Sequence, residues 1–423
     1  MNNSEKILDN GHIVTKNPRG HTIVRFGNVA QKINKIVDPL TSGLSCYVEG
    51  GDIRSEDLQI KTWSNIGNGY LGPAFNHKFV KGQILYISRN PHLRKVAIPH
   101  FDGVCANTTF VIEPQGNDVI PELIPFIMQS ETFVQHTMRK AKGSTNPYIN
   151  WKDLACYEFV VPDKQKQLYI ATLFLAAENC LIMSERFFAA AVHLKRILIR
   201  ELFSKGIGQS DFKKTKNGLT IPKNWELKSL GLLSDIKGGI QKSKDRVPKE
   251  NPRRYLTVAH VQRNFIRTDD PRYFEMSDTE LEQYRLVPGD VLVVEANGSI
   301  DELGRSAIFN GEIENCIFQN MIIRIRPKDN LLDFRYLNHF LNSSRGHESL
   351  TKMGMSSSGL FHIGVNRLMS IELPVGTLDE QRKIAAILTR CDETIAAARM
   401  NVATTKALKM RLINEMLKPE ING

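Results

Sequence analysis

The sequence predicts an α+β protein with an internal repeat, in which each of two similar halves is a mixed globular domain followed by a long helix. The first observation is that most of a segment of about 210 residues recurs in the second half of the chain. The second is that each half ends in a long stretch whose apolar residues alternate at spacings of four and three. The length of 423 residues, 41% hydrophobic and 24% charged, is enough for two or three domains with their own cores.

The repeat can be followed along the chain in five matched pairs of segments. These pairs are 22–33 with 226–237, 79–87 with 286–294, 105–112 with 318–325, 123–130 with 336–343, and 148–154 with 362–368. The offset grows from 204 to 214 residues, as small loop insertions after a duplication would produce.

Within each half, short runs typical of strands are bounded by Gly, Pro and Asn, and one or two helical patterns interrupt them. The strand-like runs include 84–88, 110–113, 291–295 and 321–326, and the helical patterns lie at 121–140 and 334–342. This mixture predicts an α+β globule in each half.

Each of the two long helices carries a narrow apolar stripe. The stripe residues are Ile170, Phe174, Ala177, Leu181, Ser184, Phe188, Ala191, Leu194, Leu198 and Leu202 in the first helix, and Ile384, Leu388, Cys391, Ile395, Ala398, Val402, Thr405, Leu408, Leu412 and Met416 in the second. This spacing is typical of a coiled-coil seam, so we expect the helices to pack against each other. Two separate amphipathic helices, each packed on its own domain, are the alternative.

The helix ends carry their own signals. Thr377 and Glu380 form a capping-box pattern at the start of the second helix, and Asp163 can cap the first. Gly206 and Pro419 mark the two C-terminal ends.

The charge balance points to an anionic partner. A net charge of +11 and a pI near 9.3 favour nucleic acid or an acidic membrane surface, although a generally basic soluble protein is also possible. There is no run of 18 apolar residues and no signal-peptide pattern at the N-terminus, so we expect neither a transmembrane helix nor a leader. The six cysteines form no CxxC pair, which predicts reduced, mostly buried thiols in a cytoplasmic protein without a zinc site.

Two similar halves in one chain imitate a homodimer, and a pseudo-twofold axis between them would make the helices antiparallel. A helix of 32 residues is about 48 Å long, and one turn of B-DNA measures about 34–36 Å. Such a helix pair could set two readers on one face of a duplex. Because the halves differ in sequence, the readers would recognise different half-sites with an unread stretch between them.

Several segments resemble the specificity (S) subunit of type I restriction–modification systems. They are LPVGTLDEQRKIAAILTRCDETI (373–395) with LKMRLINEML (408–417), the degenerate copy VVPDKQKQLYIATLF (160–174) with LKRILIRELF (194–203), and LTIPKNWELKSLG (219–231). The resemblance covers almost the full chain. Two features depart from it: Lys166-Gln167 stands where the family usually has Glu-Gln, and no Trp precedes Thr22.

The resemblance implies an architecture and a set of partners. Two target-recognition domains, 1–162 and 207–374, would be separated by two long antiparallel helices, 163–206 and 375–423, that form a coiled coil. The implied partners are double-stranded DNA, two adenine-methyltransferase (M) subunits and, in the full complex, nuclease–translocase (R) subunits. The chain itself would not be catalytic, with S-adenosylmethionine, ATP and Mg²⁺ on partner subunits only, and it would act in the cytoplasm without a membrane.

The sequence lacks the motifs of an enzyme of this kind. It has no Walker A loop and no Gly-rich cofactor loop after a strand. Asn146-Pro147-Tyr148 is only a fragment of the amino-methyltransferase motif, and Asp290 and Glu295 flank a strand as nuclease carboxylates do but lack the lysine two residues later. A nuclease or methyltransferase with an unrecognised active site, and a coiled-coil scaffold without a DNA role, are the alternatives.

Candidate DNA contacts come from three groups of segments with cationic or short polar side chains. The span 237–272 holds ten Lys or Arg against four acids, although a solvated charge run is the alternative. The other groups are the loops 88–99 and 295–309, and the segments 138–148 and 351–362, which recur at corresponding places.

The predicted DNA-contacting residues are Arg89, Asn90, Arg94, Lys95, Lys140, Lys142, Ser144, Tyr148, Lys242, Lys244, Arg253, Arg254, Asn297, Ser299, Arg305, Lys352, Ser357 and Phe361. The predicted helix–helix packing residues are Ile170, Phe174, Leu181, Phe188, Leu198, Ile384, Leu388, Ile395, Val402 and Leu412. We predict no catalytic or metal-binding residue.

Overall fold

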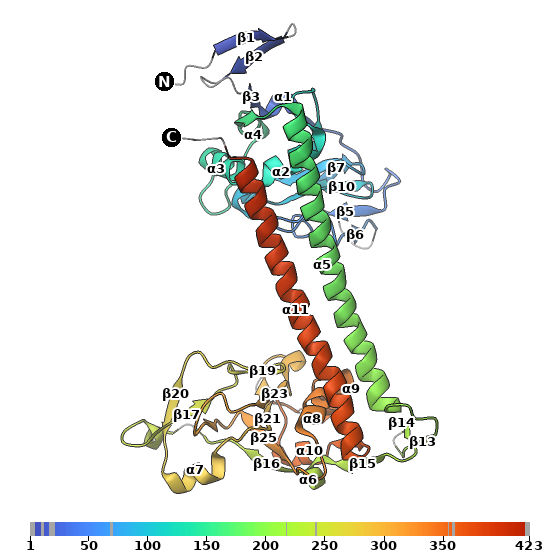
Figure 1. Cartoon of the computed structure of the whole chain (residues 1–423), viewed down its shortest axis with the longest axis vertical. Helices are drawn as coiled ribbons and strands as arrows, with labels where there is room; N and C mark the ends of the chain where they lie inside the picture. The colour runs from blue at the N-terminus through green and yellow to red at the C-terminus, as the bar shows by residue number, and fades with distance from the viewer. Residues whose placement is uncertain are drawn as a thin grey trace. The chain divides into compact units, whose positions relative to one another are not determined.

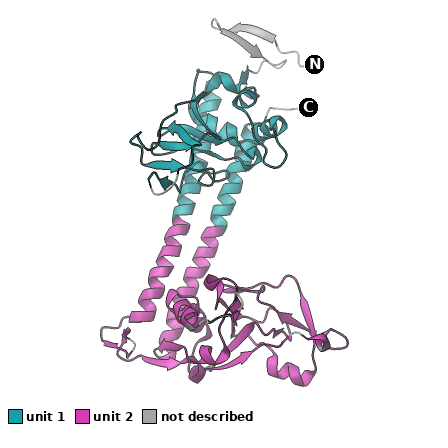
Figure 2. Cartoon of the chain, turned by 180° about the vertical axis from the view of Figure 1, so that it is seen from behind, with its two compact units in different colours: residues 1–186, 400–423 teal, residues 187–399 magenta. Residues whose placement is uncertain are grey.

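The structure is a computed structural model that divides into two compact units. Unit 1 comprises Met1–Arg186 and Met400–Gly423, and unit 2 comprises Phe187–Arg399 (Figure 2). Each unit therefore holds one globular domain of the repeat and a stretch of both long helices. The described residues are 5–9, 12–16, 22–67, 71–216, 218–241, 243–353, 355–357 and 360–418.

Unit 1 combines short strands with short helices (Figure 1). Its elements are β1 (Glu5–Asp9), β2 (His12–Lys16), β3 (Thr22–Arg25), α1 (Phe26–Val29), β4 (Ala30–Ile33), β5 (Cys46–Val48), β6 (Ser64–Asn65), β7 (Phe75–Phe79), β8 (Ile84–Ile87), η1 (Pro91–Leu93), β9 (Val96–Ala97), β10 (Gly103–Ala106), β11 (Thr109–Pro114), η2 (Pro121–Leu123), α2 (Ile124–Gln129), α3 (Glu131–Lys140), α4 (Trp151–Ala155) and β12 (Glu158–Val161). The predicted helix at 121–140 is thus broken at Ser130, whose hydroxyl accepts from the Phe133 N–H and caps α3.

Unit 2 has the same mixture of elements. They are β13 (Phe212–Lys214), β14 (Thr220–Pro222), β15 (Glu226–Ser229), α6 (Leu230–Leu233), β16 (Ser234–Gly238), η3 (Lys244–Arg246), β17 (Pro252–Leu256), β18 (Val261–Gln262), β19 (Phe265–Ile266), β20 (Arg272–Glu275), α7 (Asp278–Tyr284), β21 (Asp290–Val294), β22 (Ala296–Asn297), η4 (Ile300–Glu302), β23 (Ser306–Phe309), β24 (Ile317–Phe318), β25 (Ile322–Pro327), α8 (Phe334–Leu341), α9 (Ser344–Met353), β26 (Met355–Ser357), β27 (Leu360–His362), α10 (Val365–Met369) and β28 (Glu372–Val375). The long helices are α5 (Lys164–Lys205) and α11 (Leu378–Met416).

The same sheet order recurs in both units. Unit 1 has the sheet β4-β11-β8-β9, and unit 2 has β16-β25-β21-β23 in the corresponding places. The antiparallel pair β3–β12 is matched by β15–β28, and the parallel pair β5–β10 by β17–β24. The registers agree as well, because Pro114 pairs with Ala30 as Pro327 pairs with Ser234. The strands therefore repeat with the alignment that the sequence predicted.

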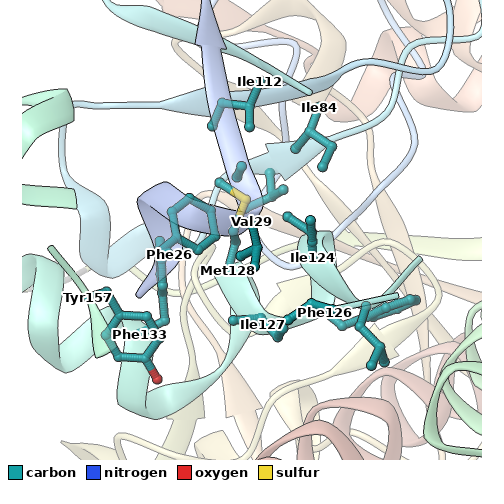
Figure 3. Packing of buried hydrophobic residues seen from close by; sticks show 14 of the residues in the cluster. Phe26, Val29, Ile84, Ile112, Ile124, Phe126, Ile127, Met128, Phe133 and Tyr157 are labelled. Atoms are coloured by element: carbon teal, nitrogen blue, oxygen red, sulfur yellow. The ribbon is translucent and has the colours of Figure 1, made fainter. Parts of the chain in front are cut away.

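The core of unit 1 is formed by α1, α2 and the central sheet. Phe26 and Val29 of α1 lie beside Ile124 and Met128 of α2 (Figure 3), and none of the four side chains is accessible to solvent. Burying an aliphatic or aromatic side chain of this size contributes about 1.5–3 kcal/mol relative to exposure. This packing fixes α1 and α2 against the central sheet of unit 1.

In unit 1, α5 and α11 lie side by side (Figure 1) and run antiparallel. Glu178 pairs with Lys409 at 2.8 Å, and the Asn401 amide donates to the Ser184 hydroxyl at 3.1 Å. Later residues of α5 therefore face earlier residues of α11. The buried Lys409 ammonium also donates to the Glu56 carbonyl at 2.9 Å, which fastens the loop before β6 to the helix pair.

The two helices are also antiparallel in unit 2. The Arg399 guanidinium lies 5.6 Å from the centre of the Phe188 ring, and Lys195 pairs with Asp392. Both helices also contribute to the domain cores: Ile170 and Phe174 join that of unit 1, and Ile384 and Leu388 join that of unit 2. Helix pairing and packing on the adjoining domain thus occur together.

Two predicted stripe positions are wrong. Leu194 is 53% exposed and Leu408 is 59% exposed, whereas the buried α11 residues near Leu408 are Lys409, Met410 and Ile413. For Leu408, the reason is that the C-terminal end of α11 packs a broader face on the domain of unit 1 than a two-helix seam requires.

A glutamine shared by both repeats explains why one helix start occurs twice. The Gln381 amide donates to the carbonyls of Leu331 and Gly376, at 3.1 and 3.2 Å, and its carbonyl accepts from the Asp333 N–H at 3.0 Å. Gln167 makes the matching set of bonds in unit 1, to the Asp118 and Pro162 carbonyls and the Ile120 N–H, each at 2.9 Å. Each glutamine ties the first turn of a long helix to the loop before a domain helix.

The capping box predicted at the start of α11 is only half formed. The Thr377 hydroxyl accepts from the Glu380 N–H at 3.3 Å, but the Glu380 carboxylate accepts from the Trp225 indole at 2.8 Å instead of returning to Thr377. It also accepts from the Ile207 N–H at 3.1 Å. In the first repeat both Trp and Glu are missing, so the two departures from the family pattern are one coupled change.

The other helix ends agree with the sequence. The Asp163 carboxylate accepts from the Lys166 N–H at 2.8 Å, and Gly206 ends α5 with a φ of +63°. A Cβ at Gly206 would also approach the Glu380 carboxylate to 2.6 Å. Pro419 lies outside the described residues.

The cysteines are free, but their burial was not predicted correctly. Cys105 and Cys316 are buried, whereas Cys180 is exposed and the other three are half-buried. Cys180 stands on the outer face of α5, where a small side chain has no core to enter.

Among the described residues, α5 is the one helix long and apolar enough, by length and composition, to cross a membrane, with a window of mean hydropathy 1.3. Because polar residues interrupt this window, the sequence shows no unbroken apolar run of 18 residues, and no such helix was expected. A helix that packs in a protein core passes the same test, and Ile170, Phe174 and Leu181 of α5 are buried within unit 1.

Candidate nucleic-acid interface

In unit 1 the structure brings together two of the predicted DNA-contacting segments. Arg89 and Lys142 both pair with Tyr148 through backbone bridges, and the Asn90 N–H donates to the Pro147 carbonyl at 2.7 Å. The Asn90 amide also donates to the Asn146 side chain at 2.9 Å. The loop after β8 and the segment after α3 therefore form a single surface.

A cleft of about 390 Å³ opens beside this surface. Its lining combines cationic, amide, hydroxyl and aromatic side chains: Lys32, Ser88, Arg89, Asn107, Thr108, Phe110, Tyr148, Ile149, Asn150 and Trp151. The Lys32 ammonium lies 4.9 Å from the centre of the Phe110 ring. Planar amides, guanidinium groups and aromatic rings are the groups that contact base edges and faces, and lysine contacts phosphates.

Unit 2 contains the same backbone arrangement. Ala296 pairs with His362 and Asn297 with Phe361, so β22, β27 and β26 form a small sheet from the segments 295–309 and 351–362. The Glu295 N–H donates to the Met321 carbonyl and the Ile363 N–H to the Glu295 carbonyl, both at 2.9 Å. Ser88 makes the matching bonds in unit 1, with Thr108 and Ile149 at 3.0 and 2.9 Å.

These matching bonds define corresponding positions in the two units. Ser88 corresponds to Glu295, Arg89 to Ala296 and Tyr148 to His362. The backbone is shared, but the side chains differ in charge and shape. The surface can therefore present one set of contacts in unit 1 and another in unit 2.

The Glu295 carboxylate is an unusual feature of the unit 2 surface. It is 9% exposed, and its Oε1 lies 3.2 Å from His362 Nε2. Burial raises the pKa of this carboxyl, and the neighbouring His362 acts in the opposite direction. The other strand-flanking carboxylate, Asp290, is fully buried and accepts from the Arg326 guanidinium at 2.7 and 2.8 Å, so it has a structural role.

Three predicted contacts are engaged inside the protein. The Arg94 guanidinium pairs with Glu131 and donates to the Gln129 carbonyl, and Lys95 donates to the Gly50 carbonyl at 2.5 Å. Arg305 donates to the carbonyls of Val261 and Val258 and pairs with Glu302. These side chains hold loops in place and are not available for contact with DNA.

Several cations of the basic span 237–272 have partners within unit 2. Arg253 pairs with Asp278 at 2.5 Å, and Arg254 donates to the Thr268 carbonyl. Arg246 pairs with Glu280, Arg267 with Asp269 and Arg272 with Asp270. The excess of positive charge in the sequence is therefore no measure of the charge available to DNA here.

Most of the remaining predicted contacts have accessible side chains. Those of Arg89, Lys140, Lys142, Ser144, Lys244 and Ser299 are exposed, and Tyr148 is 41% exposed. Asn297 and Phe361 are half-buried, and Lys352 is exposed but pairs with Glu348. Lys242 lies outside the described residues, and the side chain of Ser357 is not described.

The predicted helix-packing residues are mostly covered. Ile170, Phe174, Leu181, Ile384 and Leu388 are buried, and Phe188, Leu198, Ile395, Val402 and Leu412 are half-buried. Sequence reasoning missed the buried pair of Glu178 and Lys409, because each stands one residue after a stripe position, where a charged side chain is expected to face solvent.

Comparison with known proteins agrees with this architecture. Residues 222–403 match the family model of the type I restriction modification DNA specificity domain. The MjaVIII type I restriction enzyme specificity subunit of Methanocaldococcus jannaschii is 23% identical over 323 residues, which are 75% of this chain and 74% of that protein. A second relative from the same organism, of enzyme MjaX, is 24% identical over 212 residues. That match covers 49% of this chain, and the chain spans about half (48%) of the relative's length.

Solved structures show the same fold. A chain from a study of complex assembly and conformational transition of the type I R-M system has a TM-score of 0.58 and 18% identity, covering 94% of this chain and 98% of its own. The type I restriction-modification S subunit from M. genitalium has a TM-score of 0.54 and 15% identity, covering 95% and 96%. Residues 222–403 therefore match the type I restriction modification DNA specificity domain, and the chain as a whole is similar in sequence to type I specificity subunits and shares the fold of the solved S subunit.

Proposed function

We propose that this chain is the sequence-specific DNA-binding subunit of a type I restriction–modification complex and recognises a bipartite asymmetric site. The observation that carries the proposal is the pair of corresponding surfaces, in which one backbone arrangement presents different side chains in the two units. Arg89 and Tyr148 in unit 1 correspond to Ala296 and His362 in unit 2. Two such surfaces would read two unlike half-sites.

The exposed cations near these surfaces support contact with phosphates. Lys140 ends α3, and Lys142 lies in the segment after it, where its backbone pairs with Tyr148 of the cleft and its ammonium is 3.6 Å from the Asp153 carboxylate. The net charge of +11 agrees with a polyanionic partner. Each phosphate contact releases counterions, so affinity for DNA should fall steeply as salt increases.

The partner subunits in this proposal are two adenine methyltransferases and, in the full complex, nuclease–translocases. A groove of about 580 Å³ on the helix pair of unit 2 supports docking there. It is lined by Ala191, Leu194, Ala386, Ile387, Arg390, Cys391 and Thr394. Exposed apolar surface of this kind marks protein contacts, and it explains why Leu194 is not covered within the chain.

The catalytic chemistry is assigned to those partners. S-adenosylmethionine, ATP and Mg²⁺ would be bound by them, and this chain would act in the cytoplasm without entering a membrane. The long helices would act as the spacer between target-recognition domains 1–162 and 207–374. The antiparallel contacts within each unit support this role.

The proposal is tested by reconstituting the full chain with its cognate methyltransferase subunit on a random DNA library. We expect N6-methyladenine in one bipartite, asymmetric motif, and no methyl transfer by the chain alone. Methylation without sequence preference would contradict the proposal, and so would methyl transfer or cleavage by the lone chain. Leu194→Asp should weaken assembly with the methyltransferase, whereas the exposed Arg382→Ala on the same helix pair should not.

A further inference from the structure

Glu295 places a carboxylate on a surface proposed to meet DNA, where negative charge is unfavourable. It follows directly after β21, and its backbone is held by the Met321 carbonyl and the Ile363 N–H. The side chain is mostly buried, with His362 Nε2 at 3.2 Å from Oε1. The His362 side chain is 49% exposed, so the pair lies at the edge of the surface.

The corresponding position in unit 1 is filled differently. The Ser88 hydroxyl donates to the Thr108 carbonyl at 2.6 Å and so has a partner within the domain. Arg89 follows it on the exposed side, whereas Ala296 follows Glu295. The fold therefore does not require a carboxylate at this position, because the same backbone bonds form around a serine.

A carboxylate at this position costs free energy, both in the free protein and next to DNA. Burial penalises its charged form, and nearby phosphates would repel it. An ionised carboxylate has about four acceptor positions, and one histidine nitrogen occupies one of them. Among the side chains that the structure describes, His362 is the one ion-pair partner of Glu295, so the other acceptor positions are open to a donor from outside the domain.

Only some groups of duplex DNA supply such a donor. Phosphates offer none. In the major groove, cytosine presents the N4 amino group and adenine the N6 amino group, whereas guanine O6 and thymine O4 are acceptors that a carboxylate would repel. A carboxylate that enters the major groove therefore selects the amino-bearing edge of cytosine or adenine.

We propose that Glu295 is a specificity-determining residue of the second half-site and accepts a hydrogen bond from the exocyclic amino group of a cytosine or adenine. This inference rests on the proposed function. The first half-site lacks this contact, because Ser88 stands at the corresponding position and its hydroxyl is bonded within the domain. One position of the second half-site should thus favour cytosine or adenine over guanine or thymine.

The test uses the full chain assembled with its methyltransferase subunit and the random DNA library. The variants are Glu295→Gln, which keeps the size but adds a donor, and Glu295→Ser, which installs the residue that unit 1 tolerates. Glu314→Gln is the matched control, because it removes one negative charge from an exposed residue of the same unit. Thermal unfolding of each complex is measured in parallel.

We expect both Glu295 variants to lose about tenfold in discrimination at one position of the second half-site. The rest of the motif, the first half-site and the thermal unfolding should match the wild type and Glu314→Gln. A motif unchanged in both variants would overturn this inference alone. So would loss of preference across the whole second half-site with lower thermal stability, which indicates a structural role. A wild-type complex without any motif would instead overturn the proposed function.

Discussion

Replacing Gln381 by alanine tests whether the repeated glutamine ties the start of α11 to its domain. The side chain is 2% exposed and makes three hydrogen bonds, to the Leu331 and Gly376 carbonyls and from the Asp333 N–H. Each buried backbone group left unpaired costs about 1–3 kcal/mol. Because the space left by the side chain admits water to part of the site, we expect a loss of about 2–4 kcal/mol in the free energy of unfolding of unit 2.

The assay is hydrogen exchange read by mass spectrometry, which follows each unit separately, together with urea denaturation. Peptides covering 330–337 and 376–390 should lose protection in Gln381→Ala and keep it in the exposed control Arg382→Ala. Gln167→Ala should do the same to unit 1 alone. A loss below about 0.5 kcal/mol, or equal loosening of both units by Gln381→Ala, would refute the reasoning.

Three further predictions follow from the helix pair. Lys409→Met should destabilise unit 1 by about 3–5 kcal/mol in urea denaturation, because it leaves the buried Glu178 carboxylate unpaired; adding Glu178→Leu should recover most of the loss, and the exposed Arg411→Met should cost little. His339 is buried and its pKa is lowered to about 4, chiefly by burial, so the unfolded chain takes up its proton first and stability should fall by up to roughly 3 kcal/mol as pH drops from 6.5 toward 4. His339→Gln should flatten that part of the pH–stability curve, and an unchanged curve would contradict it. Inserting seven residues into both α5 and α11 should lengthen the unread gap of the methylated motif, and an unchanged gap would argue against the spacer role.

The sequence predicted the repeat well because duplicated strands keep their apolar alternation and their close-packing glycines. Gly27 and Gly231 illustrate this, since a Cβ at either would lie 3.1 Å from the Cβ of Ala155 or Met369, at corresponding places. The register of the central sheets followed from the same alignment. The starts of α5 and α11 look alike in sequence for a physical reason. Each has a glutamine whose side chain makes three buried hydrogen bonds, and few other residues could replace it.

The individual site residues were less predictable, because the chemistry of a side chain does not say where its partners lie. Arg94 and Arg305 have the right groups to contact DNA, but both are held by carbonyls and carboxylates of their own unit. Glu380 fits a capping box locally, yet Trp225, 155 residues earlier in the chain, binds its carboxylate. Only tertiary structure places such groups together.

The proposed DNA-contacting segments were identified because similar residues recur in both halves, but their joining into one surface in each unit was not predicted. Tyr148 pairs with both Arg89 and Lys142, and His362 with both Ala296 and Met355. The sequence separations exceed 50 residues for the first partner of each, and no local pattern records such pairings.

The most direct test of the account exchanges one recognition domain. Residues 1–160 are replaced by the corresponding segment of another family member with a known motif, and the chimera is assembled with the methyltransferase subunit. Mapping methylated adenines should show one half-site replaced by that of the donor, with the other half-site unchanged. A motif altered in both halves, or not altered at all, would contradict the claim that each domain reads its own half of the site.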